Sequence, residues 1–184
     1  MAEVRTPKPV KHFCGMLAGD VSLFGVAAER LGEQYGEVDA ESKVFDFDFT
    51  DYYENEMGPG LKKKFISFRD LIDPIDLVGI KLRTNELEAE IAQHAGRDVA
   101  RPINLDPGYL TLSKLVLATT KDYSHRLYLG RGIYAEVTLR YEDGGFAAWP
   151  WTYPDYKTEG YHNFFRRLRE MYLVQLKELG PVED

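Results

Sequence analysis

The sequence predicts an α+β protein in which helices pack on a largely antiparallel sheet. Three observations predict this class. The first segments come in the order strand, helix, strand, strand, helix, strand, which is that of a ferredoxin-like split βαβ unit. An antiparallel meander with glycine-containing turns then extends this β-α-β-β-α-β unit. A C-terminal amphipathic helix follows, and its apolar stripe requires a sheet to cover it.

Length and composition predict a single globular domain over 1–184, with short flexible tails at 1–9 and 180–184. Hydrophobic residues make up 44% and charged residues 29%, which argues against disorder. The net charge of -7 disfavours nucleic-acid binding, because phosphate neutralisation needs a basic surface. The one cysteine, Cys14, is expected to be buried and inert and favours a reducing compartment. No stretch approaches about 18 apolar residues, so we expect a cytoplasmic protein that contacts no membrane.

Local signals predict each element of the first unit. Prolines and Gly19 bound a strand at 10–19, and an apolar stripe predicts a helix from Asp20 or Ser22 to Tyr35. The next elements are a strand at 43–53, a partner strand at 61–68, a helix that is capped by Asp73 and ends at Gly96, and a short strand at 101–106.

The segment at 111–120, TLSKLVLATT, is ambiguous because it is apolar on nearly all sides. We favour a short buried helix there. The last helix is expected from Thr158 to about Leu179. Its predicted core stripe consists of Tyr161, Phe164, Phe165, Leu168, Tyr172 and Leu176.

Burial decides the register of the hairpin around the loop 130–132. A two-residue loop would put the apolar residues of its two strands on opposite faces, whereas a three-residue loop puts them on one face. That register pairs Leu127 with Ala135, Tyr128 with Tyr134 and Leu129 with Ile133, and sets Arg126 opposite Glu136. The next turn, Asp143-Gly144, suits type I′ and pairs Tyr141 with Phe146 and Thr138 with Trp149.

The reverse face of this ribbon combines an ion pair with a row of rings. It carries Arg126, Tyr128, Tyr134, Glu136, Thr138, Arg140 and Trp149, with Trp151 near its end. One interpretation is a half-exposed sheet face that cross-strand pairs stabilise. The other is a ligand platform, with rings for stacking and a guanidinium for an anion.

A second group of polar residues precedes the ribbon. Asp106-Pro107-Gly108 is typical of a turn, although Asp106 could instead be a general base or a metal ligand. Lys114, Lys121 and His125 follow soon after. A histidine near carboxylates can transfer protons, but a lone histidine at a strand start is more often structural.

Other charged clusters are interpreted as exposed faces. Asp46 and Asp48 share one strand face, with Phe45, Phe47 and Phe49 buried behind, and either bind a hard cation or keep an edge strand soluble. The acidic run continues with Asp51, Glu54 and Glu56. Lys62, Lys63 and Lys64, and Arg166, Arg167 and Arg169, are expected to be solvated.

Several signatures of known enzymes are missing, among them the phosphate-binding loop G-x-x-x-x-G-K-[ST], the G-x-S-x-G elbow, H-E-x-x-H and a cysteine pair for zinc. The string DPGYL, Asp106 to Leu110, resembles the signature of a bacterial and archaeal family catalogued as domain of unknown function 4416. The segments at 47–65, 114–122, 132–139 and 151–156 are also similar to that family. The resemblance implies the length, the single domain and a cytosolic setting.

We therefore expect a protein that binds a small anionic metabolite or nucleotide, with hydrolase or transferase chemistry as an extension. The catalytic candidates are Asp106, His125 and Glu136, of which His125 or Asp106 would move protons. The ligand-binding candidates are Lys114, Lys121, Arg126, Arg140, Trp149, Trp151 and Tyr153. The rival hypothesis is a non-catalytic interaction module that uses the aromatic loop 150–156. The sequence assigns no metal site, cofactor or oligomeric state.

Overall fold

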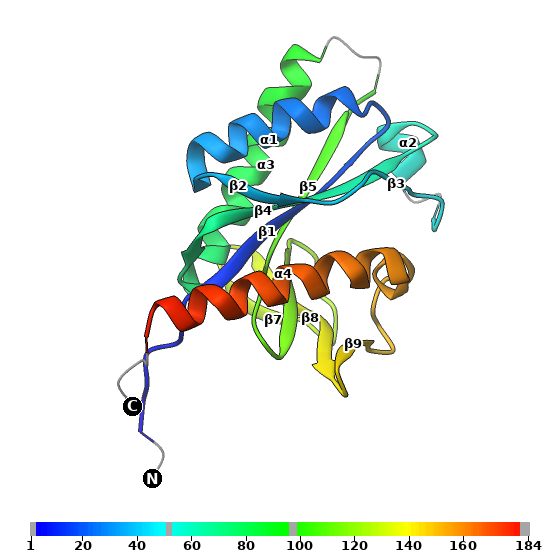
Figure 1. The fold of residues 1–184 in the computed structure, drawn as a ribbon. Coiled ribbons are helices and arrows are strands. Elements are labelled where there is room, and N and C mark those ends of the chain that lie inside the picture. Colours follow the sequence, from blue (N-terminus) through cyan, green and yellow to red (C-terminus); the bar gives the residue numbers. More distant parts are fainter. Residues whose placement is uncertain (1–2, 51–52, 96–98, 181–184) are drawn as a thin grey trace.

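The computed structural model describes residues 3–50, 53–95 and 99–180 (Figure 1). The predicted helix end at Gly96, Asp51 of the acidic run and the outer parts of both predicted tails lie outside these ranges. The elements are β1 (Val10–Ala18), α1 (Ser22–Tyr35), β2 (Val38–Glu41), β3 (Phe45–Asp46), α2 (Glu54–Met57), β4 (Lys62–Ile72), the 3-10 helix η2 (Pro74–Asp76), α3 (Leu77–His94), β5 (Ile103–Leu110), β6 (Lys114–Thr119), β7 (Leu127–Gly130), β8 (Ile133–Glu142), β9 (Gly145–Ala148), the 3-10 helix η3 (Pro154–Lys157) and α4 (Glu159–Glu178).

The strands join into one antiparallel sheet with the order β2-β4-β1-β5-β6-β8-β7, while β3 pairs with β4 and β9 with β8. The first four positions, β2-β4-β1-β5, have the strand order of a ferredoxin-like unit, with α1 and α3 as its two connections. The predicted α+β class is confirmed. The second strand of the unit lies further upstream than the prediction of 43–53. Among the described residues of that segment, 43–50 and 53, the strand is the two-residue β3, which pairs with Lys62 and Lys63 of β4.

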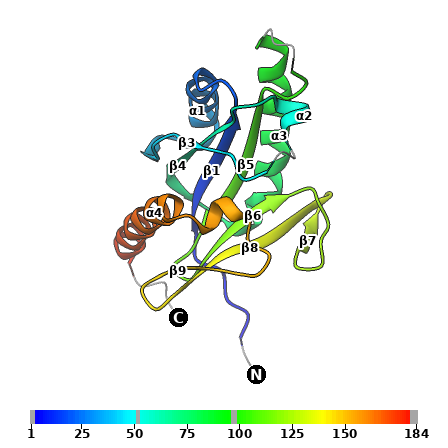
Figure 2. The same cartoon turned by 90° about the vertical axis from the view of Figure 1, so that its right-hand side faces the viewer.

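Helices cover both faces of the sheet. Helices α1 and α3 lie on one face and α4 on the other (Figure 1 and Figure 2). Side chains of β1 point to the two faces in alternation. Cys14 and Met16 pack with α1 and α3, whereas Phe13 packs with Phe165 of α4. The predicted stripe of α4 is confirmed, with five residues buried and Leu176 partly buried. Cys14 is buried as expected, and burial raises the pKa of its thiol.

The segment at 111–120 is a strand and not the predicted short helix. In β6 two alternate residues, Leu115 and Leu117, pack in the α4 core. The other two, Val116 and Ala118, pack with Leu77 at the start of α3. A strand that is buried on both faces is apolar throughout, and such a run does not reveal its period.

The register of the β7–β8 hairpin is confirmed in part. Leu127 lies opposite Ala135 and Tyr128 opposite Tyr134, but a bulge then pairs Gly130 with Ile133 in place of Leu129. The prediction that the leucines face a core is wrong, since Leu127 is 71% and Leu129 43% exposed. The apolar cluster around Leu77 of α3 extends to Ile133 of β8 and includes no residue of the edge strand β7.

Two of the predicted signals for turns and caps are confirmed. Asp143 and Gly144 have φ of 49° and 82°, as a type I′ turn requires, and Tyr141 pairs with Phe146. The ladder stops at Ala148, so Trp149 does not extend it to Thr138. Asp73 accepts a hydrogen bond from the backbone N–H of Ile75 and forms a capping box with Asp76 at the entry to α3.

Candidate functional site

The residues Asp106-Pro107-Gly108 lie inside β5 and do not form the predicted turn. They stand where β5 and β6 separate, since the two strands pair only from Gly108 to Leu110. Alternate residues of a strand direct their backbone groups to the same side, so Pro107 would direct its N–H toward β6, as Leu105 and Tyr109 do. Proline has no N–H, so the separation leaves no donor unpaired at this position.

Side chains of α3 replace the missing neighbour strand at this edge. The backbone N–H of Leu105 donates to Glu88 at 2.7 Å, and its carbonyl accepts from Nζ of Lys81 at 2.8 Å. Arg101 holds Glu88 in turn through two hydrogen bonds of 2.9 and 2.7 Å. The backbone N–H and carbonyl of Leu105 on this edge of β5 are therefore hydrogen-bonded, while a space remains open beside the strand.

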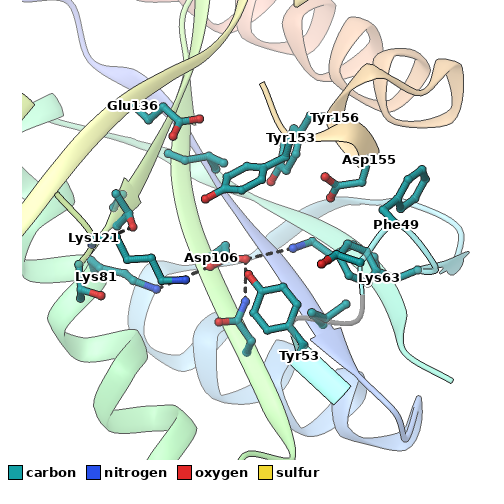
Figure 3. Close-up of a pocket in the computed structure, with 18 of the residues that line it drawn as sticks. Phe49, Tyr53, Lys63, Lys81, Asp106, Lys121, Glu136, Tyr153, Asp155 and Tyr156 are labelled. Atoms are coloured by element: carbon teal, nitrogen blue, oxygen red, sulfur yellow. Dashed lines mark hydrogen bonds and ion pairs between the residues drawn. The ribbon is translucent and has the colours of Figure 1, made fainter. Parts of the chain in front are cut away.

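That space is a cavity of about 630 Å³, within the range that suits a small-molecule ligand. Figure 3 shows Asp106 at its centre, with Lys81 and Lys121 on one side and Lys63 on the other. The charged lining residues within the described ranges are the cations Lys63, Lys81, Arg101, Lys121 and Arg126 and the carboxylates Glu88, Asp106, Glu136 and Asp155. The aromatic lining residues are Phe47, Phe49, Tyr53, Tyr123, Tyr153 and Tyr156.

Asp106 is the centre of a charged network. Its carboxylate accepts from Lys63 at 3.1 Å and from Asn104 at 2.7 Å, and Lys81 lies 3.8 Å away. Burial would raise the pKa of this carboxyl, but Lys63 and Lys81 outweigh it and lower the pKa to about 2. Asp106 is therefore ionised throughout the physiological range. This favours a fixed anion over a proton carrier.

The position of Lys63 depends on a glycine. Lys63 extends over the sheet and is only 3% exposed. Gly15, on the neighbouring strand β1, leaves the room, because a Cβ there would lie 3.1 Å from Cε and 3.3 Å from Nζ of Lys63. Burial lowers the pKa of Lys63, but the charges of Asp106 and Asp155 raise it more, so its pKa lies above the usual value and the ammonium is charged. The prediction of a solvated lysine run is wrong for this residue.

The predicted ion pair between Arg126 and Glu136 forms in the upper wall of the cavity. The two side chains are each 2% exposed and their charged atoms approach to 2.8 Å. The guanidinium also donates to the carbonyl of Lys121 at 3.0 Å and to the hydroxyl of Tyr153 at 2.7 Å. Arg126 thus ties two loops of the cavity rim to β8. Nε2 of His125 lies 3.1 Å from the same Glu136 carboxylate.

Asp155 approaches the cavity from η3, together with Tyr156. Its side chain is buried. Burial raises the pKa of Asp155, and the opposing effects of Lys63 and of nearby backbone N–H groups do not cancel this. Asp106 and Asp155 thus line one cavity with pKa values shifted in opposite directions, an arrangement that acid–base sites use.

A row of stacked rings continues outside the cavity from His125. His125 stacks on Trp151 with a centroid distance of 5.3 Å, and Trp151 stacks on Trp149 at 5.2 Å. Arg140 lies over Trp149 at 4.3 Å. Tyr123 stacks on the other side of His125 at 6.0 Å. The rings cover one another, so the row holds the loop 150–156 against β8.

Comparison with known proteins identifies a family. A family model described as Domain of unknown function (DUF4416) matches residues 8–172. The chain belongs to this family. No curated protein and no solved structure matches the chain. The predicted resemblance of the chain to this family is confirmed. In this DUF4416 member the string DPGYL lies where β5 and β6 separate.

The residues predicted for the site of this DUF4416 member fall into three groups. Those that line the cavity are Asp106, Lys121, Arg126, Glu136 and Tyr153. His125 does not line the cavity but contacts the Glu136 carboxylate, and its ring stacks on Trp151. Those outside the cavity lining are Lys114, Arg140, Trp149 and Trp151, and Lys114 is exposed at the far end of β6 opposite Arg140.

Sequence reasoning missed Lys63, Lys81, Glu88, Arg101 and Asp155. Strand alternation contained a signal for the first, because Lys63 shares a face with Phe65. Lys81 and Glu88 are seven residues apart in α3 and interrupt its apolar stripe, which indicates that both face the protein. No local pattern distinguishes Asp155.

The described residues contain no group of three or more His, Cys, Asp or Glu side chains that could hold a metal ion. Asp46 pairs with Lys62 of β4, and Phe49 is 36% exposed rather than buried behind that strand. None of the helices in the described ranges combines the length and the hydropathy of a membrane span.

Proposed function

We propose that this protein binds a small anionic metabolite or nucleotide in the cavity between β5 and β6, in a cytoplasmic setting. The observation that carries the proposal is the grouping of Lys63, Lys81 and Lys121 near Asp106, in a described lining of five cations and four carboxylates. Arg126 pairs with Glu136 and Arg101 with Glu88. The three ammonium groups therefore stand against two carboxylates, those of Asp106 and Asp155, and leave an excess of positive charge. The whole chain, in contrast, carries a net charge of -7.

The shape and lining of the cavity support the same class of ligand. Its volume suits a nucleotide or a sugar phosphate. The rings of Phe47, Phe49 and Tyr53, together with those of Tyr123 and Tyr153, line the cavity. They can cover a flat or apolar part of the ligand. Water is partly excluded there, so each charge contributes more to binding than it would at the surface.

Two lysines of β6 and the loop after it provide a matched test. Lys121 lines the cavity, whereas Lys114 is exposed at the other end of the strand. We expect Lys121→Gln to weaken the binding of ADP and of inorganic phosphate about tenfold, and Lys114→Gln to leave it unchanged. Calorimetric titration at fixed ionic strength measures both. Equal effects of the two substitutions, or no binding of any anion at millimolar concentration, would contradict the proposal.

The interaction module is the second candidate, and one observation favours it. Tyr123 and Tyr153, which line the cavity, and Trp151, which stacks on His125 outside it, are 52%, 40% and 39% exposed. Aromatic residues with this exposure occur at the centres of protein interfaces. Trp151→Ala should then abolish capture of a protein partner in pull-downs while Lys121→Gln preserves it. The reverse pattern would refute this candidate.

A further inference from the structure

The part of the cavity next to η3 contains buried polar groups that have fewer hydrogen bonds than they can form. Asp155 is 5% and Lys63 3% exposed. Within the described part of the chain, no side chain donates to the Asp155 carboxylate, and Asp106 is the one side chain that accepts from Nζ of Lys63. A carboxylate offers about four acceptor positions and an ammonium three donors, so both groups have capacity left.

A third group near Asp155 and Lys63 has no hydrogen-bond partner among the described residues. The hydroxyl of Tyr156 is buried, and it makes no hydrogen bond to any described residue. Tyr156 lines the cavity and follows Asp155 in η3. Its ring packs against Phe65 at a centroid distance of 5.9 Å, so apolar contacts restrain its position. Leaving such a hydroxyl unbonded in the interior is unfavourable, and a bound molecule that hydrogen-bonds to it removes this cost.

We propose that Asp155, Lys63 and Tyr156 form a subsite for a hydroxyl group of the ligand, so that the ligand is a hydroxylated anion such as a sugar phosphate or a ribonucleotide. The inference rests on the proposed binding function and adds the chemical class of the ligand. A hydroxyl donates to the carboxylate and accepts from the ammonium at the same time. These two bonds use the capacity that Asp155 and Lys63 retain.

The charge distribution separates this subsite from the place of the anionic group. Lys81 and Lys121 lie on the side of Asp106 away from Asp155 (Figure 3). A phosphate or carboxylate beside Asp155 would meet a second negative charge, which disfavours it there. The anionic group therefore belongs near Lys81 and Lys121, and the hydroxyl-bearing part extends toward η3.

The test compares two phosphate monoesters that differ in their hydroxyl groups. Ribose 5-phosphate has them and butyl phosphate lacks them, and calorimetry gives the affinity of each for the full chain. We expect ribose 5-phosphate to bind about tenfold more tightly, because a buried polar site rejects a ligand that leaves it unbonded. Asp155→Asn should remove most of this preference by weakening ribose 5-phosphate alone. Butyl phosphate should bind that variant equally well or more tightly, since a negative charge has gone.

Two further variants separate recognition from stability. Tyr156→Phe removes the unbonded hydroxyl, so it should reduce the preference without lowering the melting temperature of the unliganded protein. Asp46→Asn, at an exposed carboxylate outside the cavity, should leave the preference unchanged. If both monoesters bind equally, or Asp155→Asn keeps the full preference, the hydroxyl subsite is wrong while anion binding stands. If neither monoester nor inorganic phosphate binds, both proposals fail.

Discussion

Replacing Asp106 with asparagine is expected to lower the free energy of unfolding by about 3 kcal/mol. The substitution preserves the shape of the side chain but removes the anion that pairs with Lys63 at 3.1 Å. Lys63 is 3% exposed and would stay charged in the protein interior without its main partner. Urea denaturation followed by circular dichroism measures the loss. Asp46→Asn removes an exposed partner of the neighbouring Lys62 and should have no measurable effect.

The same carboxyl predicts how stability depends on pH. Its pKa is about 2 in the folded protein against an ordinary value of 3.8. Because the pKa is lower in the folded state, the ionised carboxyl contributes its full stabilisation at any pH above the ordinary pKa of 3.8. That contribution is lost as the pH falls from about 4 to about 2. The difference in free energy of unfolding between the wild-type protein and Asp106→Asn should therefore become smaller as the pH falls through this window. A difference that stays constant down to pH 2 would show that the lysines do not hold Asp106 ionised.

Gly108→Ala is expected to destabilise the protein by more than about 3 kcal/mol or to prevent folding. A Cβ at this position would lie 2.4 Å from the carbonyl oxygen of Val116 and 2.7 Å from the ring of Phe13. The carbonyl belongs to the paired part of β5 and β6, so relief of the clash requires those strands to separate further. The loss would be visible as a lower urea midpoint or as insoluble protein.

Gly25 in α1 provides the matched control for this substitution. It is exposed, and nothing lies within 4 Å of the Cβ that alanine would add. Alanine should stabilise the helix there by about 1 kcal/mol, because glycine has the greater backbone entropy in the unfolded chain. If Gly108→Ala is as stable as the wild-type protein, the close approach of the two strands does not constrain this position.

Much of the fold was predictable because its signals are local. The apolar stripes of α1, α3 and α4 and the capping residue Asp73 each lie within one element. The errors concern properties that depend on distant residues. The run 111–120 gave no period because α3 and α4 bury β6 from both sides, and Leu127 looked like a core residue although α3 does not extend over β7.

In the candidate site, too, contacts between neighbours in the sequence were predictable and contacts between distant elements were not. The contact between Arg126 and Glu136 follows from hairpin register, which adjacent residues determine. The convergence of Lys63, Asp106 and Asp155 depends on β4, β5 and η3 meeting in space, and these are separated by many residues. Asp155 is buried because η3 folds over the sheet face, and no neighbour in the sequence reveals this.

The hydrogen bonds of Glu88 and Lys81 to Leu105 have a consequence for association between molecules. An unpaired strand edge can accept a strand from a second chain, and this is a common start of aggregation. In this sheet two side chains of a helix occupy the N–H and the carbonyl that such a strand would need. The cavity beside β5 can thus admit a small molecule while a strand of a second chain cannot pair there. The sheet therefore has a gap that does not promote aggregation.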